Sequence, residues 1–263
     1  MVKSYKEYLR KTKRKKMITL FLQIFILISF IFLWEILTRV NLLNPFLVSS
    51  PLRITELLIE MIKSGELFPH ILVTTKEMIF ALVLSSISGI IIASILYLFP
   101  RVNDILDPYL ITLNAIPKTA LGPILIIYFG TNEKGIISIA ISFSIIITVL
   151  SCLSYFNNVD KNLIKMMKVL NANRLQLLLK VVFPSSFEGL LSQLKVNIGL
   201  SWVGVIVGEF LVSRYGLGYL IMYGGQVFRL DLVMMGVIIL AVLALMMNWF
   251  ITIIENIIIK RRG

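Results

Sequence analysis

Long runs of apolar residues separated by short polar loops dominate this chain. A helix rises 1.5 Å per residue, so about 20 mainly apolar residues are needed to cross a hydrocarbon core of about 30 Å. Because backbone groups inside a bilayer must satisfy their own hydrogen bonds, such segments are predicted to be helices. Six segments pass this test: 17–38, 78–98, 109–130, 136–156, 187–212 and 232–254. The predicted fold class is therefore an all-α membrane protein with six transmembrane helices.

Composition supports this class and excludes several others. Of the 263 residues, 58% are hydrophobic and only 15% are charged, whereas soluble domains have about 25% charged residues. The single cysteine, Cys152, and the single histidine, His70, exclude a disulfide scaffold, a cysteine-rich zinc module and a multi-histidine metal centre. We expect no metal site.

The distribution of cations predicts the orientation. Placing the N-terminus inside gives the cytoplasmic loops and ends 17 Lys and Arg, against 6 on the other side. Both termini are thus predicted to be cytoplasmic, in a multi-pass protein of the cell membrane. The net charge of +12 comes mainly from these loops beside the lipid bilayer, so we expect no nucleic acid partner.

The external loop after the first span contains a helix signal of its own. Ser50 and Pro51 form a capped helix start, apolar residues from Ile54 to Ile62 recur on one face, and Gly65 suits the end. We expect a short helix lying on the bilayer surface or against its neighbours.

No catalytic machinery is evident in the sequence. A phosphate-binding loop is missing, and the charged loop residues form no carboxylate pair or Ser-His-Asp set. We therefore expect a protein that is not an enzyme. If it moves a solute against a gradient, the energy must come from a partner protein or from an ion.

The loop over residues 157–186 is the most informative segment. Asp160 can cap a short helix, which Asn171 ends through a left-handed conformation. A second apolar stripe then runs from Leu175 to a predicted stop at Pro184. The apolar face of the first helix comprises Leu163, Met166, Met167 and Leu170. Another protein covers this face, or it packs beneath the adjacent helix ends.

Polar residues inside the predicted spans require a reason, because ionisable groups are costly there. Lys118, near Asn114, either faces a pore or bonds a carbonyl freed by proline. Lys195 is expected to extend to the cytoplasmic interface, and Glu209 is a gate candidate that faces water. The fifth span has a stripe of small or polar residues, which either packs against a helix or lines a wet path: Gln193, Asn197, Ser201, Gly204 and Gly208.

Several motifs together resemble the permeases of the nitrate, sulfonate and taurine importer group. In loop 157–186, Lys165-Met166-Met167, Asn171, Val181 and Phe183-Pro184 keep the spacing of that family's EAA loop but not its letters. Lys165 stands where the family has an acid. Closer matches are Pro117, Ala120, Pro123 and Phe129-Gly130; then Lys195, Gly199, Trp202 and Glu209; then Gly216-Leu217-Gly218-Tyr219-Leu220.

This resemblance implies a type I importer permease whose loop 157–186 is the coupling segment. It implies docking of cytoplasmic ATPase subunits through Leu163, Lys165, Met166, Met167, Leu170, Asn171 and Pro184. It also implies an extracytoplasmic solute-binding protein and a permease homodimer that works by alternating access. ATP and Mg²⁺ would be bound by the ATPase, with no cofactor on this chain.

The expected organisation follows from these predictions. Residues 1–16 form a basic cytoplasmic leader, 17–44 a first anchor helix and the start of an external loop, 45–259 the permease domain, and 260–263 a basic cytoplasmic tail. Asn114, Lys118, Gln193, Asn197 and Ser201 are the candidates for the translocation path, and Glu209, Gly216 and Gly218 for the gate. The alternative function is an ion-coupled secondary transporter, although we find no internal repeat.

Overall fold

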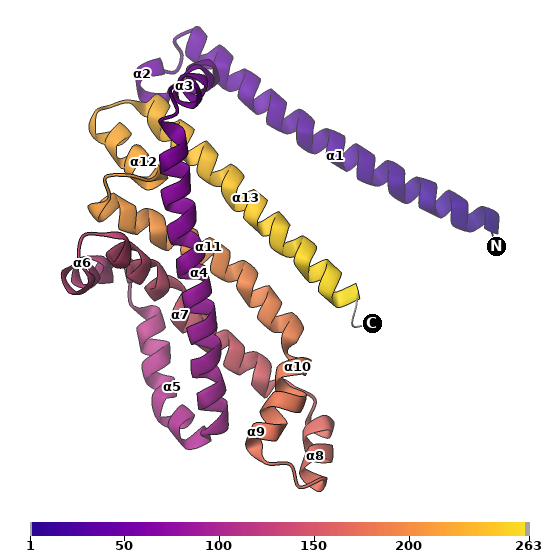
Figure 1. The fold of residues 1–263 in the computed structure, drawn as a ribbon. Coiled ribbons are helices and arrows are strands. Elements are labelled where there is room, and N and C mark those ends of the chain that lie inside the picture. The colour runs from indigo at the N-terminus through magenta and orange to yellow at the C-terminus, as the bar shows by residue number, and fades with distance from the viewer. Residues whose placement is uncertain (1, 261–263) are drawn as a thin grey trace.

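The computed structural model describes residues 2–260, and every regular element in this range is a helix (Figure 1). The expected tail at 260–263 falls largely outside the described residues. Three helices form the centre: α4 (Leu67–Leu98), α7 (Glu133–Asn157) and α11 (Phe187–Val212). Lys76 Nζ, near the start of α4, lies 2.9 Å from Glu133 Oε2 at the start of α7. These two helices therefore run in the same direction, and the chain must return between them.

Five helices are long and apolar enough to cross a membrane: α1 (Val2–Arg39), α4, α7, α11 and α13 (Leu230–Lys260). They contain the predicted segments 17–38, 78–98, 136–156, 187–212 and 232–254, and α11 has the predicted bounds. Helix α4 begins 11 residues before the predicted 78, and these additional turns contain several polar residues. Lys76 pairs with Glu133, and Glu77 is buried.

The third predicted span, 109–130, is wrong as a single straight helix. The chain forms α5 (Pro100–Ala115) and α6 (Lys118–Phe129), whose axes differ by 98°. Pro117 explains the break: it has no N–H to donate, and it disfavours helical geometry at the residue before it. Ile116 accordingly has an extended ψ of 132°. If the bent pair counts as one span, the total is six.

Three short helices gather at one end of the bundle: α2 (Pro45–Val48), α3 (Pro51–Ser64) and α12 (Leu217–Gln226) (Figure 1). Helix α3 confirms the predicted capping. Ser50 Oγ accepts from Arg53 N at 3.4 Å, and Gly65 ends the helix with φ 77°. The buried face of α3 packs in one apolar cluster with residues of α12 and α13. We refer to this end as the α3 end.

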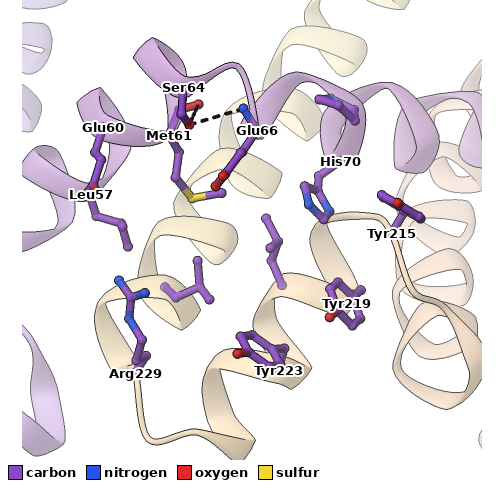
Figure 2. Close-up of a pocket in the computed structure, with 13 residues that line it drawn as sticks. Leu57, Glu60, Met61, Ser64, Glu66, His70, Tyr215, Tyr219, Tyr223 and Arg229 are labelled. Atoms are coloured by element: carbon purple, nitrogen blue, oxygen red, sulfur yellow. Dashed lines mark hydrogen bonds between the residues drawn. The ribbon is translucent and has the colours of Figure 1, made fainter.

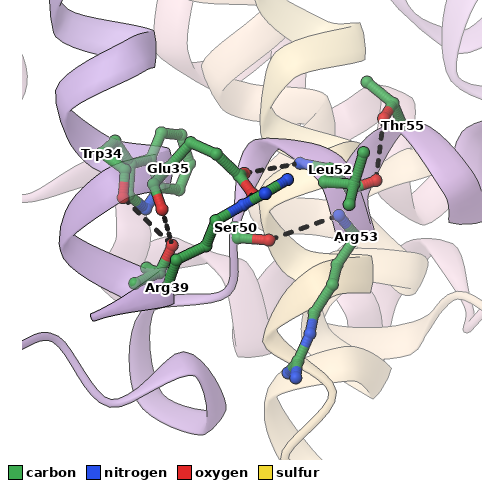
Figure 3. Close-up of polar contacts among 8 residues, drawn as sticks. Trp34, Glu35, Arg39, Ser50, Leu52, Arg53 and Thr55 are labelled. Atoms are coloured by element: carbon green, nitrogen blue, oxygen red, sulfur yellow. Dashed lines mark hydrogen bonds and ion pairs between the residues drawn. The ribbon is translucent and has the colours of Figure 1, made fainter. Parts of the chain in front are cut away.

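Helix α1 extends away from the bundle (Figure 1). It is continuous from Val2, so the predicted leader and anchor belong to one helix. None of the residues in its most apolar stretch is buried. Its attachment lies at its last turns, where Glu35 Oε2 accepts from Leu52 N at 3.1 Å and Glu35 Oε1 lies 2.7 Å from Arg39 Nε (Figure 3).

Loop 157–186 folds at the other end as α8 (Lys161–Val169), α9 (Arg174–Leu177), a π-helical turn (Leu178–Val182) and α10 (Phe183–Ser185). The expected stop at Pro184 is wrong, because the helix runs through it to Ser185. The π turn gives the reason: Phe183 N bonds back to Leu178 O, which widens the helix just before the proline ring.

Candidate functional site

The two sides of α8 have different environments. Leu163, Met166 and Leu170 are 38%, 54% and 69% exposed, whereas Ile164 and Met167 pack on the apolar cluster beneath the loop. The predicted four-residue outer face is thus corrected for Met167, which points into the protein. Val169, 81% exposed, lies on the same helix as the outward residues.

Loop 157–186 therefore exposes apolar side chains at its tip, although it lies outside the long apolar helices. Lys165 is exposed on the same helix. Contiguous exposed apolar surface of this kind usually marks contact with another protein. The sequence left two alternatives for this face. Packing beneath the helix ends accounts for Met167, whereas Leu163, Met166 and Leu170 stay exposed, as covering by a partner would require.

Asn171 ends α8 as predicted, with φ 55°. Its N–H donates to Lys168 O at 3.0 Å, and Ala172 N donates to Met167 O at 3.0 Å, so the last carbonyls of α8 have partners.

We predict that Asn171→Gly is tolerated, because glycine adopts positive φ without strain. Asn171→Val should destabilise the permease by about 1 to 2 kcal/mol through left-handed strain at a β-branched residue. Thermal unfolding of the purified permease measures both. Equal unfolding temperatures for the two variants would contradict the assigned role of Asn171.

The break between α5 and α6 contains two of the predicted path residues. Lys118 Nζ donates to Asn114 O at 2.8 Å and lies 3.4 Å from Asn114 Oδ1. The carbonyl of Asn114 is available because Lys118 N, the next residue after Pro117, begins a new helix. Lys118 thus bonds a backbone carbonyl at the helix break, which is one of the two alternatives that the sequence left open. Asn114 and Lys118 are both half-buried.

The polar stripe of α11 faces the inside of the bundle. Asn197 Nδ2 donates to Ser86 Oγ at 2.9 Å, while Asn197 Oδ1 accepts from Thr148 Oγ1 at 3.0 Å and from Gln193 Nε2 at 2.9 Å. Gln193, Asn197 and Ser201 are at most 3% exposed. Asn197 therefore links α11 to α4 and α7, and all three candidates for the path are buried inside the bundle.

Glycines on the same stripe show how closely α7 approaches. A Cβ on Gly204 would lie 2.5 Å from Ala140 Cα, and one on Gly208 would lie 3.1 Å from Ile136 Cα. Helices that approach to this distance require small residues. The structure supports the packing alternative for the whole stripe.

Lys195, on α11, has a partner that the sequence analysis did not predict. Its ammonium group pairs with Glu255 of α13, and both side chains are less than a third exposed. The two opposite charges thereby compensate each other at a site where one unpaired charge would be costly.

The first turn of α12 is held by side chains from two other helices. Gly216 N donates to His70 Nδ1 at 3.0 Å, Leu217 N to Thr74 Oγ1 at 2.8 Å, and Gly218 N to Glu209 Oε2 at 2.6 Å. The first N–H groups of a helix have no partner within it, and a carboxylate near them is favoured by the helix dipole.

Glu209, a predicted gate residue, is thus 1% exposed and does not face water. Limited space beside Glu209 explains why the other two predicted gate residues, Gly216 and Gly218, are glycines. Gly216 has φ 113° and no space for a Cβ against the Glu209 carboxyl group, and a Cβ on Gly218 would lie 2.8 Å from Glu209 Oε2. The three predicted gate residues therefore meet at one junction.

Glu77 of α4 is a residue that the sequence analysis missed. It is 1% exposed, and its carboxyl group approaches that of Glu209. The signal was present as a charged Lys76-Glu77 pair directly before the predicted start of a span. With Thr74 and His70, Glu77 shows that α4 provides much of this junction.

A cavity of about 550 Å³ opens beside the junction at the α3 end (Figure 2). His70, Tyr219 and Tyr223 form a stack along it, with ring centroids 6.0 Å and 5.9 Å apart. Glu60 of α3 and Arg229 lie around the same cavity.

Most of this chain matches a known protein family. Residues 82–261 match the model of the family described as binding-protein-dependent transport system inner membrane component. The match covers well over half of the chain. The chain belongs to this family of permeases.

Relatives agree with this assignment. The chain is 26% identical over 231 residues to the putative aliphatic sulfonates transport permease protein SsuC of Bacillus subtilis, covering 88% of this chain and 84% of the relative. It is 24% identical over 220 residues to the taurine transport system permease protein TauC of Escherichia coli, covering 82% and 80%.

The fold also agrees. It is similar to a chain of the MetNI methionine ABC transporter, in a structure titled as inward-facing, with a TM-score of 0.64 and 12% identity over 76% of this chain and 98% of that chain. The protein is therefore the transmembrane permease subunit of a binding-protein-dependent ABC importer, with the type I permease fold. It is a multi-pass membrane protein, and the ion-coupled alternative has no support.

Proposed function

We propose that this permease imports a small solute of the sulfonate, taurine or nitrate kind, or a vitamin-precursor-like molecule, by alternating access driven by a partner ATPase. The observation that carries the coupling is the exposed apolar tip of loop 157–186, formed by Leu163, Met166 and Leu170. Such a surface suits docking into a groove of a cytoplasmic protein. The named solutes come from the relatives and from the resemblance noted in the sequence.

The ATPase would supply the energy, with ATP and Mg²⁺ bound there. The sequence of this chain has no phosphate-binding loop, which supports a transport subunit that is not itself an enzyme. Lys165, exposed beside the apolar tip, favours an acidic group on the docking surface of the ATPase.

A second copy of the permease would complete the path. Helix α5 has no buried residue in the single chain, and the bend after it holds the half-buried Asn114 and Lys118. Polar and charged groups facing lipid would be costly, so covering this edge with a second copy is favoured. Asn114 and Lys118 then remain candidates for the path, whereas Gln193, Asn197 and Ser201 act within each copy.

The cavity at the α3 end would face the extracytoplasmic solute-binding protein, and the Glu209 junction would lie at the outer gate. The junction fixes the start of α12 to both α4 and α11, so a movement of either helix reaches the cavity through His70 and Tyr219.

The orientation gives a direct prediction. With the bent pair counted as one span, six crossings would put both ends of the chain and loop 157–186 on the same side, and the cation count favours the cytoplasm for that side. Reporters after Gly263 and between Lys161 and Arg174 should read as cytoplasmic, and one between Arg53 and Lys63 as external. An external signal from the Lys161 fusion would contradict this topology.

The proposed function is tested by reconstituting the permease with the ATPase and binding protein encoded beside its gene. ATP hydrolysis should rise when the binding protein carries taurine, an alkyl sulfonate or another tested solute, and the purified complex should contain two permease copies. Neighbouring genes that encode neither partner, or hydrolysis indifferent to every loaded binding protein, would oppose the proposal.

A further inference from the structure

A second cavity lies beneath loop 157–186, between the loop and the ends of the central helices. Its volume is about 250 Å³, and it is lined by residues of α4, α5, α7, α8 and α9. No Asp or Glu is among its described lining residues. Its polar lining consists of Tyr97, Asn103, Asn157, Lys168 and Arg174.

The two cations of this cavity come from two helices of loop 157–186, α8 and α9. Arg174, at the start of α9, donates through Nη1 to Leu98 O at the end of α4 at 3.0 Å. Within the described range, its other N–H groups have no recorded partner. Lys168, in the last turn of α8, has no ion pair with any described carboxylate. Two positive charges are thus held at one cavity without a compensating anion.

A buried amide group on the same cavity also has an atom without a hydrogen-bond partner. Asn103 Oδ1 is inaccessible to solvent and has no hydrogen-bond partner among the described residues. Asn103 lies in the first turn of α5, a helix of 16 residues that begins at Pro100 on the cavity. A buried polar group is normally bonded, so a ligand with a donor group here, or with an acceptor if the amide is rotated, would satisfy it.

The cavity also has an apolar lining, which includes Leu96, Leu153, Ile164 and Leu177. Near this end α4 also exposes Ile91 and Ile95, which are spaced four residues apart and therefore share one face. An acyl chain can lie along such a stripe while a headgroup occupies the cavity.

We propose that this cavity binds a phosphate group through Lys168 and Arg174, supplied by the headgroup of an anionic phospholipid or by free phosphate. Basic pockets between transmembrane helices suit such headgroups, and a guanidinium group suits a phosphate. The ligand would link α8 and α9 of the loop to α4 and α5. The assignment of the lipid to the cytoplasmic leaflet depends on the orientation proposed above. The binding of a phosphate group does not depend on that orientation.

The test uses the full-length permease in nanodiscs with two lipid compositions. Discs of phosphatidylcholine with phosphatidylglycerol test the lipid, and discs of phosphatidylcholine alone, titrated with inorganic phosphate, test the free anion. Native mass spectrometry counts retained phosphatidylglycerol, and thermal unfolding reports protection by either ligand. Because neither readout needs transport, failure here is separable from failure of the proposed function.

Lys168→Gln should lower binding about fivefold, as expected for one cation near a phosphate, and adding Arg174→Gln should lower it about fivefold again. Lys168 makes no described hydrogen bond through its side chain, so the single variant should fold. Arg174→Lys should retain part of the binding. Lys161→Gln, with the same change of charge at the other end of α8 and outside the cavity lining, is the matched control and should bind as the parent does.

Retention of phosphatidylglycerol that depends on Lys168 identifies the lipid as the source. Protection by phosphate with the same dependence, but without lipid retention, identifies the free anion. Binding that falls equally in Lys161→Gln and Lys168→Gln, or no binding of either ligand, would overturn the proposal.

Discussion

Met166→Asp is expected to abolish solute-stimulated ATP hydrolysis by the reconstituted importer while leaving the permease folded and inserted. Met166 is 54% exposed on the outer face of α8, so the free permease tolerates a carboxylate there. In the docked complex, losing a buried side chain of this size costs about 1.5 to 3 kcal/mol, which weakens ATPase binding about 10- to 100-fold. Desolvating the new charge adds to this cost.

Met167→Asp separates docking from folding on the same helix. Because Met167 packs on the apolar cluster beneath the loop, this variant should lower the unfolding temperature of the permease itself. Asn162→Asp is the matched control, because it adds the same charge to α8 one turn before Met166, at a residue that is already polar and exposed. Full stimulation of hydrolysis in Met166→Asp would remove loop 157–186 from the coupling role.

Gly216→Ala is expected to destabilise the permease and to abolish uptake. The residue has φ 113°, which alanine adopts only with strain, and its new methyl group would collide with the Glu209 carboxyl group. Left-handed strain and overpacking together cost about 2 to 5 kcal/mol. Part of this cost can be relieved by releasing the start of α12, which would loosen the three hydrogen bonds of the junction.

Gly225→Ala provides a matched control on the same short helix, because no atom lies within 4 Å of its added Cβ. It should leave the unfolding temperature unchanged or raise it slightly. Glu209→Gln keeps an oxygen for Gly218 N, so it should be milder than Glu209→Ala. Similar unfolding temperatures and uptake for Gly216→Ala and Gly225→Ala would show that the junction does not need its glycine.

The sequence by itself determined the features that depend on local or one-dimensional physics. Span length and hydropathy predicted five of the six spans, because a bilayer imposes a fixed thickness on every helix that crosses it. Capping chemistry predicted α3 from Ser50, Pro51 and Gly65, and the left-handed stop at Asn171. These outcomes depend on residues a few positions apart, whose preferences neighbouring helices do not reverse.

Only the tertiary structure decided which side of a helix meets a neighbour. Helical periodicity placed Met167 with Leu163, Met166 and Leu170, but the core beneath the loop takes Met167 inward. Lys195 pairs with Glu255, 60 residues away, and Glu209 turns from a water-facing residue into the buried cap of α12. The direction of α6 after Pro117 was equally undetermined. Each of these outcomes depends on partners distant in sequence, which hydropathy and spacing along one segment do not contain.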